Sequence, residues 1–276
     1  MLLKFTKMHG LGNDFIVIDL VTQHLSLTEE KIRFLADRRR GIGCDQILTV
    51  EPPQNPEVDF RYRIYNCDGT EVEQCGNGAR CFAKFVVDRK LIAKNLIKVE
   101  TSAGTIELSI LANGEVEVDM GIPEFMPSAI PIDTTAEQST YTLNVNGEVV
   151  SFVAVSMGNP HAVIRVENTL GAAVSTLGPI LESHSFFPHK TNVGFMQIVS
   201  RAEINLRVYE RGAGETQACG TGACAAVVAG IHLGLLDSEV KTNLTGGTLM
   251  IRWEGRGTSV IMTGPATTVY QGQIQL

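Results

Sequence analysis

Two cysteines of this chain lie in almost the same local sequence. Cys75 is followed by G-N-G-A-R-C and Cys219 by G-T-G-A-C, so each precedes Gly-x-Gly and a run of small residues. Both stretches predict the start of a helix, over 76–89 and 220–236, where unpaired N–H groups and the positive end of the helix dipole lie. A thiol at such a place should have a lowered pKa. A carboxylate could also bind there, held by the backbone N–H groups of Gly76, Asn77, Gly220 and Thr221.

Two thiols on opposite sides of one α-carbon could invert its configuration. One thiolate would remove the α-proton, and the other group, as a thiol, would protonate the planar carbanion from the opposite face. Charge that develops on the adjoining carboxylate must then be stabilised, which converging backbone N–H donors can do. The sequence shows no sign of an electron-sink cofactor, so we expect none.

The surroundings of the two cysteines belong to a longer internal repeat. Residues 63–79 align without gaps to 207–223, and seven of the seventeen positions are identical. Two weaker pairs follow the same order along the chain: 9–18 with 156–164, which matches Asn13 to Asn159, and 44–50 with 194–200. Three pairs in one order indicate two halves with a common fold.

Each half contains short alternating segments and one long helix. Val, Ile and Thr at a period of two predict strands at 97–101, 106–110, 116–120, 149–155, 204–209 and 248–253. The helix predicted over 220–236 is apolar on all sides, so protein should surround it completely. We therefore expect an α/β (α+β type) fold of two pseudo-symmetric domains, each a mixed, largely antiparallel sheet wrapped around a central buried helix.

Proline marks the boundary between the halves. The segment 121–131 holds three of the ten prolines and is typical of an extended crossover. The C-terminal T-V-Y-Q-G-Q-I-Q-L predicts a last strand that returns to the first half. The expected domains are 1–120 plus 265–276, and 121–264.

Composition narrows the class of protein. The chain has 276 residues and a net charge of −7, which gives no sign of a nucleic-acid or anionic-membrane surface. The first residues lack the continuous apolar segment of a signal peptide. Six cysteines in this length do not resemble a secreted disulfide framework, so we expect a cytoplasmic protein with reduced thiols.

Other uses of the cysteines and glycines are less favoured. The remaining cysteines, Cys44, Cys67, Cys81 and Cys224, are interpreted as small buried apolar residues. The spacings do not suit a zinc site, and no metal is expected. Residues 220–225 also fit the dinucleotide fingerprint G-x-G-x-x-A, but that motif requires a strand directly before it, and the preceding residues are typical of a loop.

Four motifs resemble signatures of the diaminopimelate epimerase family. They are M-H-G-L-G-N-D-F (8–15), D-G-T-E-V-E-Q-C-G-N-G-A-R-C (68–81), V-S-M-G-N-P-H (155–161) and Y-E-R-G-A-G-E-T-Q-A-C-G-T-G-A-C (209–224). The likeness runs from residue 4 to the C-terminus. It implies a PLP-independent, cofactor-free isomerase that converts LL- to meso-2,6-diaminopimelate in bacterial lysine and peptidoglycan synthesis. Relatives also suggest a homodimer.

The resemblance assigns roles to individual residues. Cys75 and Cys219 match the catalytic pair, and His161 and Glu210 match groups that assist thiol deprotonation. The positions that match substrate-holding residues are Asn13, Gln46, Asn66, Asn159, Asn192, Glu210 and Arg211, together with the backbone at Gly76, Asn77, Gly220 and Thr221. Amides and a guanidinium suit the ammonium and carboxylate at the distal end of diaminopimelate.

Rival functions remain open at this stage. A proline racemase or hydroxyproline epimerase would use two cysteines without needing Arg211, and a two-lobed amino-acid-binding protein would perform no chemistry. Phenazine-pathway isomerases of the same fold lack the cysteine pair. Cys44, in G-I-G-C-D-Q, is expected to add a further thiol near the cleft.

Overall fold

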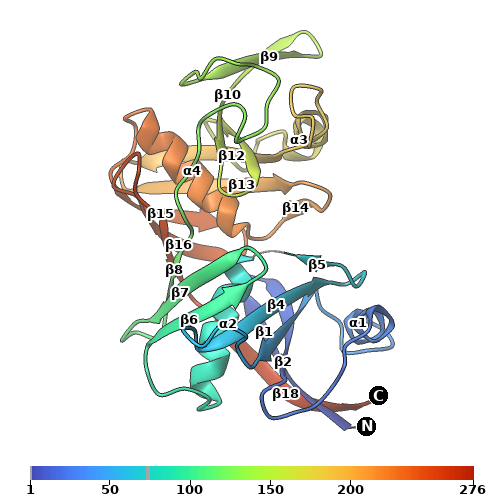
Figure 1. Cartoon of the computed structure of the whole chain (residues 1–276). Helices are drawn as coiled ribbons and strands as arrows, with labels where there is room; N and C mark the ends of the chain where they lie inside the picture. Colours follow the sequence, from blue (N-terminus) through green and yellow to red (C-terminus); the bar gives the residue numbers. More distant parts are fainter. Residues whose placement is uncertain (1, 73–74) are drawn as a thin grey trace. The chain divides into compact units, whose positions relative to one another are not determined.

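The computed structural model describes residues 2–72 and 75–276, so Glu73 and Gln74 of the first cysteine motif lie outside the described residues. The chain divides into two compact units (Figure 1). Unit 1 comprises Met1–Asp119 and Thr263–Leu276, and unit 2 comprises Met120–Met262. No helix of the described chain has the length and apolar character needed to cross a membrane.

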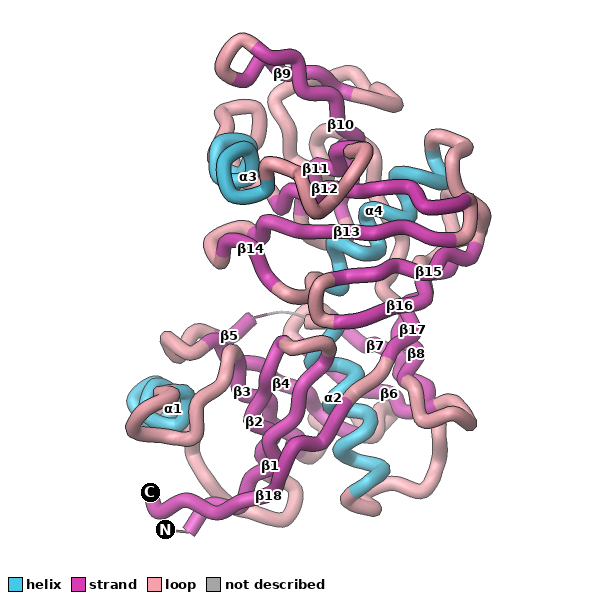
Figure 2. Tube along the Cα trace, turned by 180° about the vertical axis from the view of Figure 1, so that it is seen from behind, coloured by secondary structure: helices cyan, strands magenta, loops and turns pink. Residues whose placement is uncertain are grey.

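Unit 1 contains one mixed sheet and two helices. Its strands are β1 (Leu2–Gly10), β2 (Asn13–Asp19), β3 (Gln46–Glu51), β4 (Phe60–Asn66), β5 (Glu71–Val72), β6 (Leu96–Thr101), β7 (Gly104–Ile110), β8 (Val116–Asp119) and β18 (Thr267–Gln275). Its helices are α1 (Glu29–Ala36) and α2 (Gly76–Asp88). β2–β3 and β4–β6 are parallel, whereas β1–β2, β1–β18, β3–β4, β4–β5, β6–β7 and β7–β8 are antiparallel. β18 pairs with β1, which confirms that the C-terminal strand returns to the first half (Figure 2).

Unit 2 repeats this plan. Its strands are β9 (Tyr141–Val145), β10 (Glu148–Ser156), β11 (Pro160–Arg165), β12 (Asn192–Ser200), β13 (Glu203–Glu210), β14 (Gly214–Thr216), β15 (Glu239–Leu244) and β16 (Gly247–Arg252), and β17 (Ile261–Gly264) lies where the chain leaves the unit. Its helices are α3 (Val174–Glu182) and α4 (Gly220–His232). β11–β12 and β13–β15 are the parallel pairs, as β2–β3 and β4–β6 are in unit 1. The mixed sheets and the shared order confirm the expected fold class.

Strand register corrects one of the sequence alignments. In unit 1 Phe15 pairs with Gln46, and in unit 2 His161 pairs with Asn192. Gln46 therefore corresponds to Asn192, at the same offset that relates Asn13 to Asn159. The alignment of 44–50 with 194–200 was wrong by four residues. An even shift keeps the same side chains on the same face of a strand, so an apolar alternation alone cannot detect it.

The central helix of each unit is enclosed by its own sheet. α2 contacts β1, β2, β3, β7, β8 and β18, whereas α4 contacts β10, β11, β12, β13, β15 and β16. Every residue of α4 from Gly222 to Gly230 is buried, which confirms the prediction from its apolar surface. The helix is shorter than predicted, because Leu233 caps it and Gly234 adopts a left-handed φ of 70°.

Three further details differ from the predictions. Each unit has a second, shorter helix, α1 or α3, that the sequence patterns did not reveal. The segment 121–131 is extended only at its start, where Glu124 bridges Ser156, and it then forms turns from Met126 onward. Cys67 is exposed rather than buried, because it lies in the turn that follows β4.

The glycine at the third position of α2 has a steric reason. A Cβ at Gly78 would lie 2.5 Å from the hydroxyl oxygen of Tyr62. Tyr62 is fully buried, and its hydroxyl has no hydrogen-bond partner among the described residues.

We predict that Gly78→Ala destabilises the protein by about 1–3 kcal/mol, because the added methyl group overpacks the interior. Tyr62→Phe removes the obstructing oxygen and an unsatisfied polar group, so the Gly78→Ala/Tyr62→Phe variant should recover most of the loss. Urea denaturation gives the free energy of unfolding of the parent protein, the two single variants and the double variant. The steric explanation would be contradicted if Gly78→Ala lowered this free energy equally with and without Tyr62→Phe.

Candidate active site

The first candidate thiol lies at the N-terminus of α2. Cys75 occupies the N-cap position and is partly exposed. Its Sγ is 3.6 Å from Oδ1 of Asn13, which begins β2. A tight turn at Leu11 and Gly12, both with positive φ, brings β2 back along β1. The β1–β2 hairpin therefore places an amide oxygen beside the thiol.

Amide side chains continue from this point along the sheet. Asn77, which is buried near the start of α2, donates from Nδ2 to the same Asn13 oxygen at 3.3 Å. On the neighbouring strands Gln46 donates from Nε2 to Oδ1 of Asn66 at 3.0 Å. Asn66 in turn donates to the Thr70 hydroxyl at 3.2 Å. Unit 1 thus brings Asn13, Cys75 and Asn77 together, with Gln46 and Asn66 paired at the adjoining strand ends.

The second candidate thiol has a more enclosed position. Cys219 is only 5% exposed and is the N-cap of α4. Its Sγ accepts the N–H of Gly222 at 3.3 Å and lies 3.5 Å from the Thr221 hydroxyl. Burial, followed by the negative charge of Glu210, raises the pKa of Cys219 well above its ordinary value, although the Thr221 and Gly222 hydrogen bonds oppose this.

This result corrects the prediction that the helix N-terminus lowers the pKa of Cys219. A buried thiolate loses its hydration, and that loss outweighs the lowering of the pKa by the Thr221 and Gly222 hydrogen bonds. The thiol also has a hydrogen bond with the Glu210 carboxylate, which favours the protonated sulfur. Glu210 itself lies at the end of β13 and accepts a hydrogen bond from the Thr216 hydroxyl. The carboxylate is therefore placed to receive the proton of this thiol.

His161 is buried beside this group. The side chain lies on β11, is 1% exposed, and places Nε2 3.0 Å from Oδ1 of Asn159. Burial, together with the positive charge of Arg211, lowers the pKa of His161 to about 3. The imidazole is therefore neutral near pH 7. With an amide oxygen as the partner of Nε2, its proton is on Nε2 and Nδ1 carries the free lone pair.

Two other predicted binding residues lie at the ends of neighbouring strands. Asn192 is buried, its Oδ1 accepts the backbone N–H of Arg211 at 2.9 Å, and its Nδ2 donates to the carbonyl of Pro160 at 3.0 Å. The exposed Arg211 side chain donates from Nη1 to the carbonyl of His189 at 3.1 Å. Asn192 therefore fixes the backbone from which the exposed Arg211 side chain extends.

The amide of Asn159 joins the residues of unit 2. Its Nδ2 donates to the Thr221 hydroxyl at 3.3 Å, while its Oδ1 faces His161. Unit 2 therefore collects Asn159, His161, Glu210 and Thr221 around Cys219. Gly220 and Thr221 supply the first backbone N–H groups of α4, as Gly76 and Asn77 do for α2.

Cys44 does not belong to this arrangement. It is 3% exposed and packs in an apolar cluster with Ile16, Ile18 and Ile47. Burial raises the pKa of Cys44 to about 12. The burial confirms the interpretation of Cys44 as a small apolar residue of the interior.

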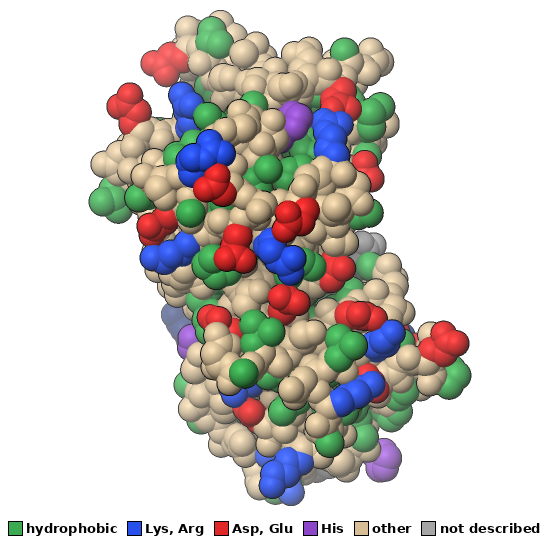
Figure 3. Space-filling model, turned by 90° about the vertical axis from the view of Figure 1, so that its left-hand side faces the viewer, with side chains coloured by type: hydrophobic (Ala, Val, Ile, Leu, Met, Phe, Trp, Pro, Cys, Tyr) green, Lys and Arg blue, Asp and Glu red, His purple; other side chains and the backbone are tan. Residues whose placement is uncertain are grey.

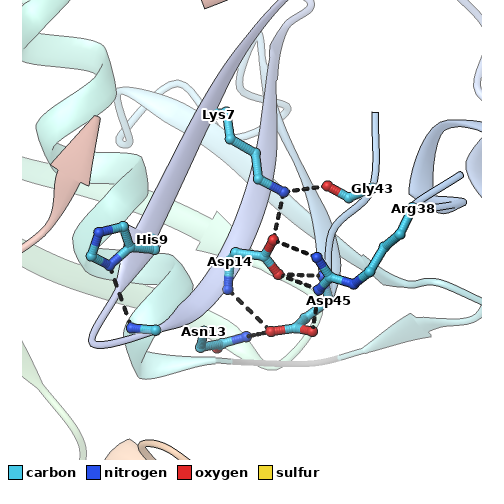
Figure 4. Close-up of polar contacts among 8 residues, drawn as sticks. Lys7, His9, Asn13, Asp14, Arg38, Gly43 and Asp45 are labelled. Atoms are coloured by element: carbon cyan, nitrogen blue, oxygen red, sulfur yellow. Dashed lines mark hydrogen bonds and ion pairs between the residues drawn. The ribbon is translucent and has the colours of Figure 1, made fainter. Parts of the chain in front are cut away.

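A charged network that the sequence patterns did not reveal lies next to Asn13. Lys7 and Arg38 both form ion pairs with Asp14, and Arg38 also contacts Asp45 (Figure 4). Burial alone would raise the pKa of Asp14, but hydrogen bonds from Arg38 and Lys7 hold it well below its usual value. The available signal was the position of Asp14 in the 8–15 motif and of Asp45 in G-I-G-C-D-Q, directly beside Asn13 and Gln46.

The low pKa of His161 predicts a dependence of stability on pH. Because the unfolded chain binds a proton near pH 6.5 and the folded chain only near pH 3, acidification favours unfolding within this window. From pH 7 to pH 5 this residue should reduce the free energy of unfolding by about 2 kcal/mol. His161→Gln should lose less stability than the parent protein over the same range. Urea denaturation at both pH values compares them, and parallel losses would contradict a neutral, buried His161.

A family model described as diaminopimelate epimerase matches residues 5–126 and 153–269. Proteins named diaminopimelate epimerase from Stutzerimonas stutzeri and Pseudomonas aeruginosa are each 58% identical to the chain over 276 residues, covering 100% of both sequences.

Solved structures at lower identity share the fold. One is a probable proline racemase from Agrobacterium radiobacter, at 15% identity and a TM-score of 0.71, covering 99% of this chain and 93% of that one. A phenazine biosynthesis protein from Bacillus anthracis has 16% identity and a TM-score of 0.69, with 100% of both chains covered. These likenesses concern the fold, whereas the family match and the full-length identity identify the group: the chain belongs to the diaminopimelate epimerase family.

Proposed function

We propose that this protein inverts one stereocentre of LL-2,6-diaminopimelate to give the meso isomer, with Cys75 and Cys219 as the two acid–base groups. As a member of its family it is an isomerase, and diaminopimelate epimerisation serves lysine and peptidoglycan precursor synthesis. One observation carries the proposal for the two cysteines: in two units of matched topology, each is the N-cap of a central, enclosed helix that begins with Gly-x-Gly.

In the proposed reaction one sulfur takes the α-proton and the other supplies a proton to the opposite face. The α-carboxylate binds backbone N–H groups at the two helix starts, those of Gly76 and Asn77 and those of Gly220 and Thr221. These donors stabilise the enolate-like charge as it develops, so the reaction needs no cofactor or metal. The expected domains, 1–120 plus 265–276 and 121–264, would each form one lobe of the enzyme.

Deprotonation of the thiols needs local bases. Burial makes Cys219 a weak acid, so thiolate formation requires a neighbour that accepts its proton. Glu210 already has a hydrogen bond with this thiol, and the neutral His161 offers a free lone pair nearby. We assign both residues to proton transfer at Cys219.

The distal end of the substrate carries its own ammonium and carboxylate. We assign the carboxylate to the exposed guanidinium of Arg211, and the ammonium to amide oxygens among Asn13, Gln46, Asn66, Asn159 and Asn192. Glu210 can also contribute to substrate binding from the residue before Arg211. Proline and hydroxyproline have no second charged end, so this group of residues favours diaminopimelate over them.

We also infer that the protein works in the cytoplasm, as a homodimer like that suggested by its relatives. Six cysteines in a chain of 276 residues do not resemble a secreted disulfide framework, as expected for a protein of a reducing compartment. On the face seen in Figure 3, acidic and basic side chains are interspersed rather than separated by sign. That face therefore offers no extended basic surface for nucleic acid or an anionic membrane.

Exchange with solvent tests the two-thiol mechanism. Purified protein in D₂O, without added cofactor, should incorporate deuterium at the α-carbon of LL-diaminopimelate, as followed by mass spectrometry. Cys75→Ala and Cys219→Ala should each reduce epimerisation by about 1,000-fold or more, because each removes one of the two proton-transfer groups. Cys67→Ser serves as the matched control and should retain activity. Absence of exchange in the parent protein would instead support a binding protein, and rapid turnover by either alanine variant would exclude a two-thiol mechanism.

Substrate choice tests the assignment of Arg211. Arg211→Gln should lower kcat/KM for diaminopimelate by about 30-fold, because a charge-assisted hydrogen bond is lost. Arg201→Gln removes another exposed arginine of unit 2, one that pairs with Asp237, and should change kcat/KM little. Steady-state measurements of kcat/KM for both variants, with diaminopimelate and with proline as substrate, test the role of Arg211. Turnover of proline at a comparable rate would favour a proline racemase.

A further inference from the structure

The amide of Asn13 lies between a carboxylate and a second amide, and each of them binds one end of it. On one side is the Asp45 carboxylate, which can only accept hydrogen bonds, and on the other is Asn77, whose oxygen is held by Arg80. Asparagine has one accepting and one donating end, so its neighbours determine which end faces the Cys75 thiol.

Asp45 fixes the donating end. Its Oδ2 accepts Nδ2 of Asn13 at 3.1 Å and the backbone N–H of Asp14 at 3.1 Å (Figure 4). Its Oδ1 is bound by Arg38 at 2.8 Å, and Arg38 also makes a bidentate pair with Asp14. The carboxylate of Asp45 is thus held in place from both sides, and the nitrogen of Asn13 must point toward it.

Arg80 fixes the accepting end through Asn77. The guanidinium of Arg80 is completely buried and donates to Oδ1 of Asn77 at 2.8 Å and to the carbonyl of Pro265 at 3.2 Å. Because a guanidinium has no acceptor, the oxygen of Asn77 must face it, and Nδ2 of Asn77 then points toward Asn13. The contacts of Asn13 with Asp45 and with Asn77 therefore require the same orientation, in which the oxygen of Asn13 faces Asn77 and the Cys75 thiol.

The described residues of unit 2 do not repeat this arrangement of charged side chains. By the strand register, Thr191 occupies the position equivalent to Asp45, and in the cysteine repeat Cys224 occupies that of Arg80. Asn159, the counterpart of Asn13, directs its oxygen to His161, and the sulfur of Cys219 accepts an N–H from Gly222. The charged residues around Asn13 therefore distinguish the two thiols of a duplicated site.

We propose that Asp45 and Arg80 are positioning residues that hold the Asn13 oxygen toward Cys75, so that this sulfur rests as a protonated hydrogen-bond donor. The inference rests on the proposed acid–base role of Cys75, but its geometry lies entirely within unit 1. Neither Asp45 nor Arg80 needs to touch substrate. Their effect on Cys75 passes through the orientation of one amide group.

Alkylation of Cys75 measures this effect without substrate. Asp45→Asn offers Arg38 an oxygen and turns an N–H donor toward Asn13 and the backbone N–H of Asp14. The nitrogen of Asn13 then loses its acceptor at this end, so the reversed amide becomes populated. An N–H directed at the sulfur stabilises the thiolate, so the rate of carbamidomethylation by iodoacetamide at pH 7 should increase on the order of fivefold. A Cys67→Ser background leaves Cys75 as the sole cysteine in the tryptic fragment from Ile64 to Arg80, and mass spectrometry of that fragment gives the rate.

Two controls separate the amide from general loosening of the structure. Asp59→Asn is the matched variant, because Asp59 also pairs one oxygen with a cation, Lys94, and accepts a backbone N–H, from Lys98, with the other. Asp59→Asn should leave the rate of Cys75 alkylation unchanged. In an Asn13→Ala background Asp45→Asn should have no further effect, because the amide that transmits it is absent.

The outcomes are distinct. An increase with Asp45→Asn that disappears with Asn13→Ala supports the proposal. A rate that is lower, unchanged within about twofold, or equally increased in the Asn13→Ala background overturns it. Asp45→Ala removes the acceptor without supplying a donor, and should give a smaller increase if Asp45→Asn fails to fold. Failure of the proposed epimerase function would appear in the deuterium assay and leave these rates unaffected.

Discussion

The candidate site depends on close packing at the start of two buried helices. Gly78 and Gly222 are the third residues of α2 and α4, and each lies against the preceding long strand of its unit. A Cβ at Gly222 would lie 3.0 Å from Val208, and one at Gly78 would lie 3.5 Å from Ile64, the equivalent residue. Because the glycines lack side chains, each helix can begin within the sheet, with its cysteine and first N–H groups at the sheet edge.

Burial of this kind has an electrostatic consequence. A thiol inside the protein is a weaker acid than a thiol in water, and the hydrogen bonds from Thr221 and Gly222 do not compensate for the burial of Cys219. The protein must therefore supply a specific proton acceptor rather than rely on a free thiolate. In the proposed mechanism Glu210 and the neutral His161 meet this need. Glu210 has a hydrogen bond with the Cys219 thiol, and His161 contacts Asn159, whose amide donates to Thr221.

The two units share a backbone plan but differ in their polar groups. Around Cys75 the side chains form a chain of fixed polarity between charged residues, which begins at Arg38 and ends at Arg80. Around Cys219 the partners are a carboxylate, a neutral imidazole and a hydroxyl. The two thiols of the duplicated scaffold therefore have different polar surroundings.

Much of the architecture could be predicted from the sequence because its signals are local. Glycine spacing, the apolar circumference of α4 and the repeated motif depend on neighbouring residues, so they predicted the central helices, the repeat and the cysteine positions. The short helix α1 was missed because, at eight residues, its apolar period is brief and its surface is charged. The four-residue error in the third repeat arose because alternation does not determine register.

By itself the sequence determined which residues could perform chemistry and that the chain contains two related halves. Only the tertiary structure decided the state and orientation of those residues. The enclosure of Cys219 and His161, the exposure of Cys67 and the burial of Cys44 all depend on which distant strands cover them. The direction of the Asn13 amide likewise follows from Asp45 and Arg80, which are far from it in sequence. Desolvation and amide polarity are set by contacts between distant residues, and no local pattern encodes them.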